Sequence, residues 1–146
     1  EAKVYIDKYL SMYPGVKAYM EEIVKKAKDD GYVTTIFGRR RVIEELNNTN
    51  YMIRKSGERM ALNTPVQGSS ADIIKKAMIE IDSEIIKRGL NTKMLIQVHD
   101  ELVFSVPKSE LVLVKELVAN VMENTYKILV PLKVEEEIGD NWYDAK

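Results

Sequence analysis

Apolar side chains at the start of the chain recur every three or four positions, as they do on one face of a helix. An opening helix is predicted to end near Leu10. Pro14 suits the first turn of a second helix because its φ is fixed. Gly31 suits the end of that helix because glycine adopts the left-handed conformation without strain. Two consecutive helices are therefore predicted before residue 32.

The middle of the chain is predicted to hold two further helices, separated at a proline. The first should cover residues 51–63. The sequence Thr64-Pro65-Val66-Gln67 then combines an N-cap threonine, a proline at the first helical position and a glutamine three residues after the cap. The second helix should end at Lys87-Arg88-Gly89, where cations meet the negative end of the helix dipole and a glycine follows.

Four segments are predicted to be strands. They are Tyr32–Phe37, which is β-branched and aromatic, the two apolar runs Lys93–Val98 and Leu102–Val106, and Val130–Ile138. Only three residues separate the second segment from the third, so these two strands must form an antiparallel hairpin. An amphipathic helix over residues 111–126 precedes the last strand. This order of helices, hairpin, helix and strand predicts the α+β class.

Composition narrows the kinds of site that the chain can build. The 146 residues are 45% hydrophobic and include no cysteine and one histidine, His99. Disulfides, thiolate metal sites and histidine-ligated zinc are therefore not expected, and a bound metal should be a hard cation held by carboxylates. No apolar run approaches the ~20 residues that cross a bilayer. We expect a cytoplasmic protein with no membrane contact.

The net charge of −1 conceals an uneven distribution. From Arg39 to Lys76 there are eight basic and four acidic residues, whereas from Asp100 to Lys146 there are ten acidic and five basic ones. A basic middle permits nucleic-acid binding on one face, although solvated surfaces of mixed charge are common.

Two acids, Asp100 and Glu101, lie at the tight end of the predicted apolar hairpin. Polar residues are common in turns, and aspartate is a frequent turn residue. Alternatively, rigid carboxylates hold divalent cations in two-metal enzymes, where the two ions lie about 3.5–4 Å apart. Two acids from one turn do not complete such a site, so at least one more carboxylate would have to come from elsewhere.

The sequence around these acids, Gln97-Val98-His99-Asp100-Glu101, resembles the third conserved motif of bacterial family A DNA polymerases. Further segments match that family in the same order along the chain. They are Tyr13–Lys17, Gly31–Thr35, Gly38–Arg41, Glu58–Gly68, Ala71–Lys75 and Trp142–Lys146. The resemblance implies the C-terminal part of the polymerase domain, with a partial palm whose antiparallel hairpin and sheet pack on long helices. Residues 1–50 would end the fingers, residues 51–146 would end the palm, and the upstream palm, the thumb and the main fingers helix would lie outside this chain.

The resemblance also implies roles for individual residues. Asp100 would be a catalytic Mg²⁺ ligand, and Glu101 a nearby catalytic carboxylate that acts as a looser ligand or tunes the site. Three polar residues on the preceding helices and the histidine would contact DNA. His99 would contact the primer end, Gln67 and Asn63 the minor groove, and Arg59 the template strand and incoming nucleotide. Each also has a structural alternative: Gln67 as a helix cap, Arg59 in a surface ion pair and His99 as a structural histidine.

The activity implied is template-directed nucleotidyl transfer by a DNA-directed DNA polymerase of replication and repair, with two Mg²⁺ ions. Its partners would be primer–template DNA, deoxynucleoside triphosphates and the missing upstream part of the polymerase, which carries the second metal anchor. The chain alone is therefore expected to be inactive and to expose an unpaired sheet edge. A single-subunit RNA polymerase of related fold and a non-catalytic nucleic-acid-binding module are the alternatives.

Three consecutive arginines, Arg39, Arg40 and Arg41, follow the first predicted strand. Side chains on an extended segment point alternately to opposite faces, so at most two of the three can face one partner. Structural pairing and template contact both remain open for them.

Overall fold

The structure is a computed structural model that describes residues 2–145. The chain divides into two units, residues 1–69 and 70–146, and the boundary falls inside the long helix α3 (Tyr51–Lys87). Each unit has its own cluster of buried apolar side chains and its own two-stranded antiparallel sheet. The predicted α+β class is confirmed. No helix in residues 2–145 is long and apolar enough to cross a membrane.

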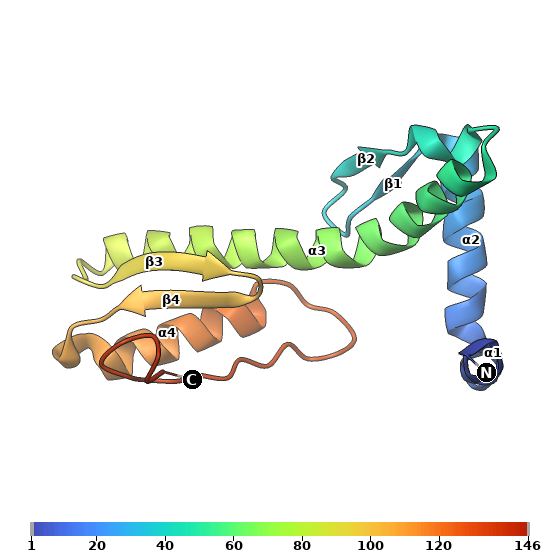
Figure 1. The fold of residues 1–146 in the computed structure, drawn as a ribbon. Helices are drawn as coiled ribbons and strands as arrows, with labels where there is room; N and C mark the ends of the chain where they lie inside the picture. Colours follow the sequence, from blue (N-terminus) through green and yellow to red (C-terminus); the bar gives the residue numbers. More distant parts are fainter. Residues whose placement is uncertain (1, 146) are drawn as a thin grey trace. The chain divides into compact units, whose positions relative to one another are not determined.

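The first unit begins with helices α1 (Ala2–Met12) and α2 (Pro14–Asp30). Pro14 begins α2 and Gly31 ends it with a φ of 79°, as predicted. Strands β1 (Tyr32–Thr34) and β2 (Arg40–Val42) then form a hairpin, and the 3-10 helix η1 (Glu44–Asn47) leads into α3 (Figure 1). Strand β1 is shorter than the predicted segment because the chain turns at residues 36–37.

The core of the first unit lies between α2, the β1–β2 hairpin, η1 and α3. Its buried members are Ala27, Val33, Ile43, Leu46 and Ala61. The backbone of η1 lies so close to α3 that a Cβ atom on Gly57 would lie 2.9 Å from the Leu46 nitrogen. Burial of one large aliphatic side chain contributes roughly 1.5–3 kcal/mol to stability. Ile43 and Leu46, both 1% exposed, are therefore the main stabilising side chains of this unit.

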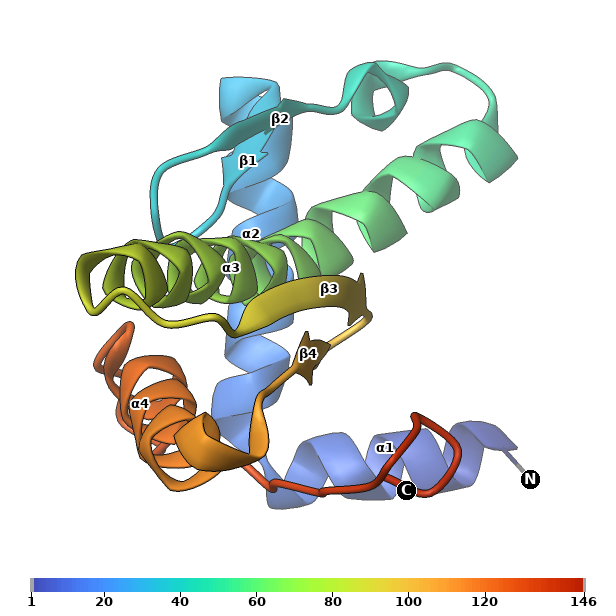
Figure 2. The same ribbon diagram turned by 90° about the vertical axis from the view of Figure 1, so that its left-hand side faces the viewer.

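The second unit contains the rest of α3, the strands β3 (Lys93–Val98) and β4 (Glu101–Ser105), the 3-10 helix η2 (Lys108–Glu110) and helix α4 (Leu111–Asn124). Strands β3 and β4 pair antiparallel, so the predicted hairpin is confirmed. Its inner side packs with α3 and α4 around a buried cluster (Figure 2). That cluster consists of Ile81, Ile85 and Leu117, with Met94, Leu102 and Phe104 against it.

The predicted helix break at Thr64 is wrong, because α3 continues through Pro65 to Lys87. Thr64 is only 6% exposed, and its hydroxyl oxygen accepts a hydrogen bond from Arg41. It therefore does not act as an N-cap, and Gln67 does not belong to a capping box. The predicted end of the helix is confirmed: Gly89 has a φ of 65°, and its N–H donates to the Ile86 carbonyl.

The predicted strand Val130–Ile138 is also wrong. Residues 129–139 form no strand in the structure, and most of their side chains are exposed. The Val134 N–H donates to the Glu123 carboxylate at 3.2 Å, and Lys115 pairs with Glu136 at 2.9 Å. A strand requires a neighbour that accepts its backbone hydrogen bonds. In the described part of the chain this segment pairs with neither β3 nor β4, although each of these strands has a free edge there, and the Pro131 and three glutamates of the segment disfavour a strand.

Candidate functional site

The tip of the β3–β4 hairpin is a two-residue turn made by His99 and Asp100. His99 has a φ of 54°, in the left-handed region where histidine is enriched among non-glycine residues. The side-chain amide of Gln97 donates a hydrogen bond to the His99 carbonyl oxygen. The backbone that presents Asp100 is therefore fixed by a tight turn, by the strand pairing of Val98 with Glu101 and by this side-chain contact.

The carboxylates of Asp100 and Glu101 are exposed at this rigid tip. Neither forms a hydrogen bond or an ion pair with another residue in the part of the chain that the structure describes. Carboxylate oxygens are the donors that Mg²⁺ prefers. No group of three or more potential ligands that would enclose a metal occurs within residues 2–145. The donor type thus fits a hard cation, but the donor set is incomplete.

The second set of predicted residues, Arg59, Asn63 and Gln67, lies on α3 in the first unit. All three are exposed, and their spacing of four residues places them along one face of the helix. An arginine followed by two amides, each one turn apart, is a row of hydrogen-bond donors open to solvent. Such a row can approach a surface of acceptors along its length.

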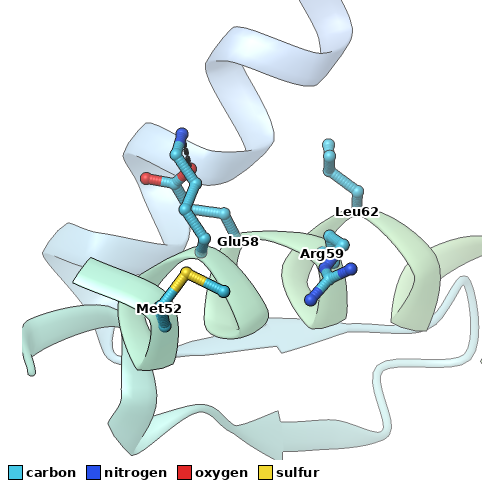
Figure 3. Close-up of a pocket in the computed structure, with 5 residues that line it drawn as sticks. Met52, Glu58, Arg59 and Leu62 are labelled. Carbon is cyan, nitrogen blue, oxygen red and sulfur yellow. Dashed lines mark hydrogen bonds and ion pairs between the residues drawn. The ribbon is translucent and has the colours of Figure 1, made fainter. Parts of the chain in front are cut away.

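The surface ion pair that is the structural alternative for Arg59 does not form with the neighbouring Glu58. Glu58 instead receives Lys28 from α2 and Lys55 from α3, each at 2.7 Å. The hydrogen bond from Lys28 is the main cause that lowers the pKa of Glu58 below its ordinary value. Figure 3 shows the Arg59 guanidinium pointing away from this carboxylate. Arg59 is thus left available at the surface.

A hollow of about 430 Å³ opens beside Arg59 on α3 (Figure 3). It is lined by Met52, Lys55, Glu58, Arg59 and Leu62. Lys55 shares the Glu58 carboxylate with Lys28, and Arg59 forms no ion pair with the described residues of this lining. The hollow therefore combines an apolar wall with a positively charged side, which suits a flat or anionic group better than a metal ion.

The three consecutive arginines, of which Arg40 and Arg41 lie in β2, point alternately to two faces, as the alternation of an extended segment predicts. Arg39 donates to the Gly68 carbonyl at 3.2 Å, and Arg41 donates to the Thr64 hydroxyl at 3.1 Å. Arg40 instead lies over the ring of Tyr32, 4.9 Å from its centroid. Structural pairing with α3 is therefore established for Arg39 and Arg41. Sequence reasoning missed their partners, because those lie 29 and 23 residues away in the chain.

The six predicted site residues thus form two local sets, one in each unit. The structure brings His99, Asp100 and Glu101 together at the β3–β4 tip. It brings Arg59, Asn63 and Gln67 together on one face of α3. The first set offers carboxylate oxygens and an imidazole, and the second offers a guanidinium cation and two side-chain amides, each of which can donate and accept hydrogen bonds.

Comparison with known proteins gives consistent matches over the whole chain. The model of the family described as DNA polymerase family A matches residues 1–144. DNA polymerase I of Streptococcus pneumoniae serotype 4 (strain ATCC BAA-334 / TIGR4) and that of Bacillus subtilis (strain 168) are each 52% identical over 146 residues. These matches cover 100% of this chain and 17% of each relative, so the chain spans about one sixth of their length.

Among solved structures, the chain is similar to one described as the POL domain of Pol1 from M. smegmatis in complex with DNA primer-template and dNTP. The TM-score is 0.96 at 45% sequence identity, and the match covers 99% of this chain and 26% of that one. The similarity thus extends to the backbone as well as to the sequence.

Proposed function

We propose a function from one established fact: this chain belongs to DNA polymerase family A. The protein is a DNA-directed DNA polymerase, and this chain is the C-terminal part of its polymerase domain. The observation that carries the proposal is the similarity to a polymerase domain in complex with primer-template DNA and dNTP, together with a rigid, acid-bearing hairpin tip. In this assignment residues 1–50 end the fingers and residues 51–146 end the palm.

The proposed reaction is template-directed nucleotidyl transfer to the 3′ end of a primer. The primer 3′-hydroxyl oxygen forms a bond to the α-phosphorus of a deoxynucleoside triphosphate, the bond from that phosphorus to the bridging oxygen breaks, and pyrophosphate leaves. Two Mg²⁺ ions would lower the pKa of the hydroxyl and stabilise the charge on the leaving oxygens.

Asp100 is the residue of this chain that would ligate Mg²⁺, because its carboxylate stands at the end of a rigid hairpin. Glu101 would be the looser ligand or would tune the charge of the site. The set within residues 2–145 is incomplete, so the second anchor is assigned to the upstream part of the polymerase. His99 would contact the primer end from the same turn.

The donors on α3 would serve the nascent base pair. Gln67 and Asn63 would donate to purine N3 and pyrimidine O2 in the minor groove, acceptors that occur in every base pair. A donor at these positions tests the geometry of a pair without reading its sequence, as a template-copying enzyme requires. Arg59 would lie near the template strand and the incoming nucleotide.

The chain by itself would not extend a primer, since one metal anchor and the main fingers helix are assigned to the upstream part of the polymerase. Its unpaired sheet edge would bind the upstream strand, and the isolated chain would tend to associate. The whole enzyme would act on DNA in the cytoplasm during replication and repair. Purified isolated chain that incorporates nucleotides would contradict this assignment of parts.

The test is primer extension by the full-length polymerase that contains this chain, with Asp100→Asn compared with Asp140→Asn. Both changes remove one exposed acid from the second unit, so the net charge changes equally. Asp100→Asn should lower kcat by ~100-fold or more, as removal of one transition-state stabiliser does. Asp140→Asn should leave kcat unchanged, and neither variant should change Tm.

Glu101→Gln should have an intermediate effect, in line with a looser role. Extension that survives Asp100→Asn would show that the catalytic acid has been misassigned. DNA affinity that depends on neither Mg²⁺ nor Asp100, without extension, would identify a binding module instead. Extension with ribonucleotides in preference to deoxynucleotides would favour an RNA polymerase.

A further inference from the structure

Pro65 lies inside α3, between Asn63 and Gln67. Proline has no N–H to donate to the carbonyl four residues earlier, and its ring crowds that carbonyl. One turn of α3 therefore lacks a hydrogen bond that its neighbours have. The same turn carries two of the residues that would contact DNA, so their positions depend on what else holds the helix there.

The β1–β2 hairpin contacts α3 at this turn, and both ribbon views show its tip against the helix (Figures 1 and 2). The Ile36 N–H donates to the Ser69 hydroxyl oxygen at 2.9 Å, and that hydroxyl donates to the Pro65 carbonyl. Arg41 donates to the Thr64 hydroxyl oxygen at 3.1 Å and lies 3.3 Å from the Met60 sulfur. We call these hydrogen bonds, together with the hydrogen bond from Arg39 to the Gly68 carbonyl oxygen, the hairpin–helix contact.

The hairpin–helix contact is closely packed. A Cβ atom on Gly68 would lie 2.8 Å from the Thr35 methyl carbon and 3.3 Å from an Arg39 nitrogen. Thr35, Thr64 and Ser69 are 5%, 6% and 7% exposed. Buried hydroxyl groups require hydrogen-bond partners: Thr64 and Ser69 have theirs within the contact, and Thr35 accepts the Arg39 N–H within the hairpin. The turn of helix around Pro65 is thus held by hydrogen bonds whose donors Ile36, Arg39 and Arg41 come from the hairpin, together with the bond from Ser69 to Pro65 within the helix.

The contact leaves the exposed face of α3 open. Successive helical residues are rotated by about 100°, so Thr64 and Gly68 lie to one side of the row formed by Asn63 and Gln67. Those two side chains are exposed, whereas Thr64 and Ser69 are buried. The hairpin therefore fixes the backbone beneath Asn63 and Gln67 without covering either side chain.

We propose that Arg41 is a positioning residue for DNA: through the hairpin–helix contact it holds the turn of α3 around Pro65, and thereby sets the geometry of Gln67 and Asn63 at the primer–template. This rests on the proposed function of those two residues. Arg41 itself does not touch DNA. Its effect appears in DNA affinity and in discrimination between matched and mismatched primer ends, because both depend on the placement of the two amide donors.

The experiment uses the full-length polymerase with Arg41→Ala, and Arg40→Ala as the matched control. Both substitutions remove one arginine from β2, but Arg40 faces Tyr32 and not α3. Each is made with and without Gln67→Ala. The measurements are Kd for primer–template at several salt concentrations, kcat/KM for matched and mismatched primer ends, and Tm.

Arg41→Ala should reduce the matched-to-mismatched ratio by about tenfold, the equivalent of one or two hydrogen bonds. Arg40→Ala should leave the ratio unchanged. Adding Gln67→Ala to Arg41→Ala should cause little further loss, because residues that act through one another are not additive. The slope of affinity against salt should be the same in all variants, since no phosphate contact is removed.

The results distinguish failure of the positioning role of Arg41 from failure of the proposed DNA role of Gln67. If Gln67→Ala impairs discrimination but Arg41→Ala behaves like Arg40→Ala, the positioning role is overturned and the proposed function stands. If Arg41→Ala adds fully to Gln67→Ala and lowers the salt slope by about one, Arg41 binds a phosphate directly and the inference is wrong. If Gln67→Ala has no effect, the DNA role of Gln67 fails and the positioning role fails with it.

Discussion

The β1–β2 hairpin directs arginines at the side of a helix, whereas the β3–β4 hairpin directs acids away from its own unit's core. In the first, Arg39 and Arg41 bond to α3 and Arg40 lies over an aromatic ring. In the second, Asp100 and Glu101 have no protein partner in the described part of the chain. Both hairpins are short and antiparallel, so the difference lies in where their polar groups find partners.

This difference distinguishes charges that are paired within the fold from charges that are not. An arginine run looks like a nucleic-acid site in sequence, yet here two of its three members serve the fold. The carboxylate pair on the β3–β4 turn has no ion pair within the described part of its unit, which agrees with the proposal that it binds a metal ion.

The largest expected effect concerns the separate cores beneath the two hairpins. Ile43 in the first unit and Ile81 in the second are 1% and 0% exposed. Truncation of either to alanine should cost about 2–5 kcal/mol in unfolding free energy. Hydrogen exchange of the full-length protein should show Ile43→Ala loosening β1 and β2, and Ile81→Ala loosening β3 and β4. Equal loss of protection in both hairpins from either variant would show that they share one core.

The next largest effect tests how closely the β1–β2 hairpin is packed on its helix. Gly68→Ala should cost about 1–3 kcal/mol, because the new Cβ meets the Thr35 methyl group at 2.8 Å. Thr35→Ser removes that methyl group and keeps the hydroxyl that accepts the Arg39 N–H. The double variant should therefore recover most of the lost Tm.

Gly15→Ala is the control for this pair, because a Cβ there has no neighbour within 4 Å and Gly15 also lies in a helix. It should leave the stability unchanged or raise it slightly. If Thr35→Ser fails to rescue Gly68→Ala, the close approach of hairpin and helix is not the source of the loss.

Most helices and strands could be predicted from local sequence patterns, because residues within or next to each element determine where it begins and ends. Pro14, Gly31 and Gly89 mark helix ends through their own backbone preferences, and the short spacing between β3 and β4 required a hairpin. The break predicted at Thr64 failed because its hydroxyl is used by Arg41, 23 residues earlier. The strand predicted over residues 130–138 failed because a strand depends on a partner, which its own sequence does not specify.

The same rule holds for the candidate site: its locally determined features could be predicted from the sequence, and its long-range contacts could not. The acids at the hairpin tip were predictable, since a turn between two apolar strands fixes their place. The positioning contacts of Arg41 and Ser69 were not, because they join residues that no periodicity relates.

A smaller expected effect is a difference between the two hairpins in how their local stability depends on pH. The Glu110 carboxylate accepts bonds from the Asn91 N–H at 2.8 Å and the Thr92 N–H at 3.0 Å, where the chain enters β3. These bonds, that from the Asn91 backbone foremost, lower the pKa of Glu110 below its ordinary 4.5. The stabilisation is therefore present above pH 4.5 and is lost as the pH falls through the lowered pKa.

Exchange protection of the Asn91 and Thr92 amides should accordingly fall in acid, and Glu110→Gln should remove the pH dependence. The Ile36 amide, which donates to the hydroxyl of Ser69, has no acid as its partner and should keep its protection over the same range. Local amides are the proper measure, because Glu58 in the first unit also has a lowered pKa and affects global unfolding. Equal acid sensitivity of the Ile36 and Thr92 amides would remove the distinction between the two hairpins.

The smallest expected effect is that of Arg40→Ala on stability. Arg40 lies at the surface over the Tyr32 ring, 4.9 Å from its centroid, and an exposed cation–π contact contributes about 0.5–1 kcal/mol. Arg41→Ala leaves the buried Thr64 hydroxyl without its donor, which costs about 1–3 kcal/mol. Urea denaturation should therefore place Arg40→Ala nearer to the parent protein. The reverse order would mean that the strand presents its arginines to the opposite faces, and the assignment of Arg41 to the helix would fall.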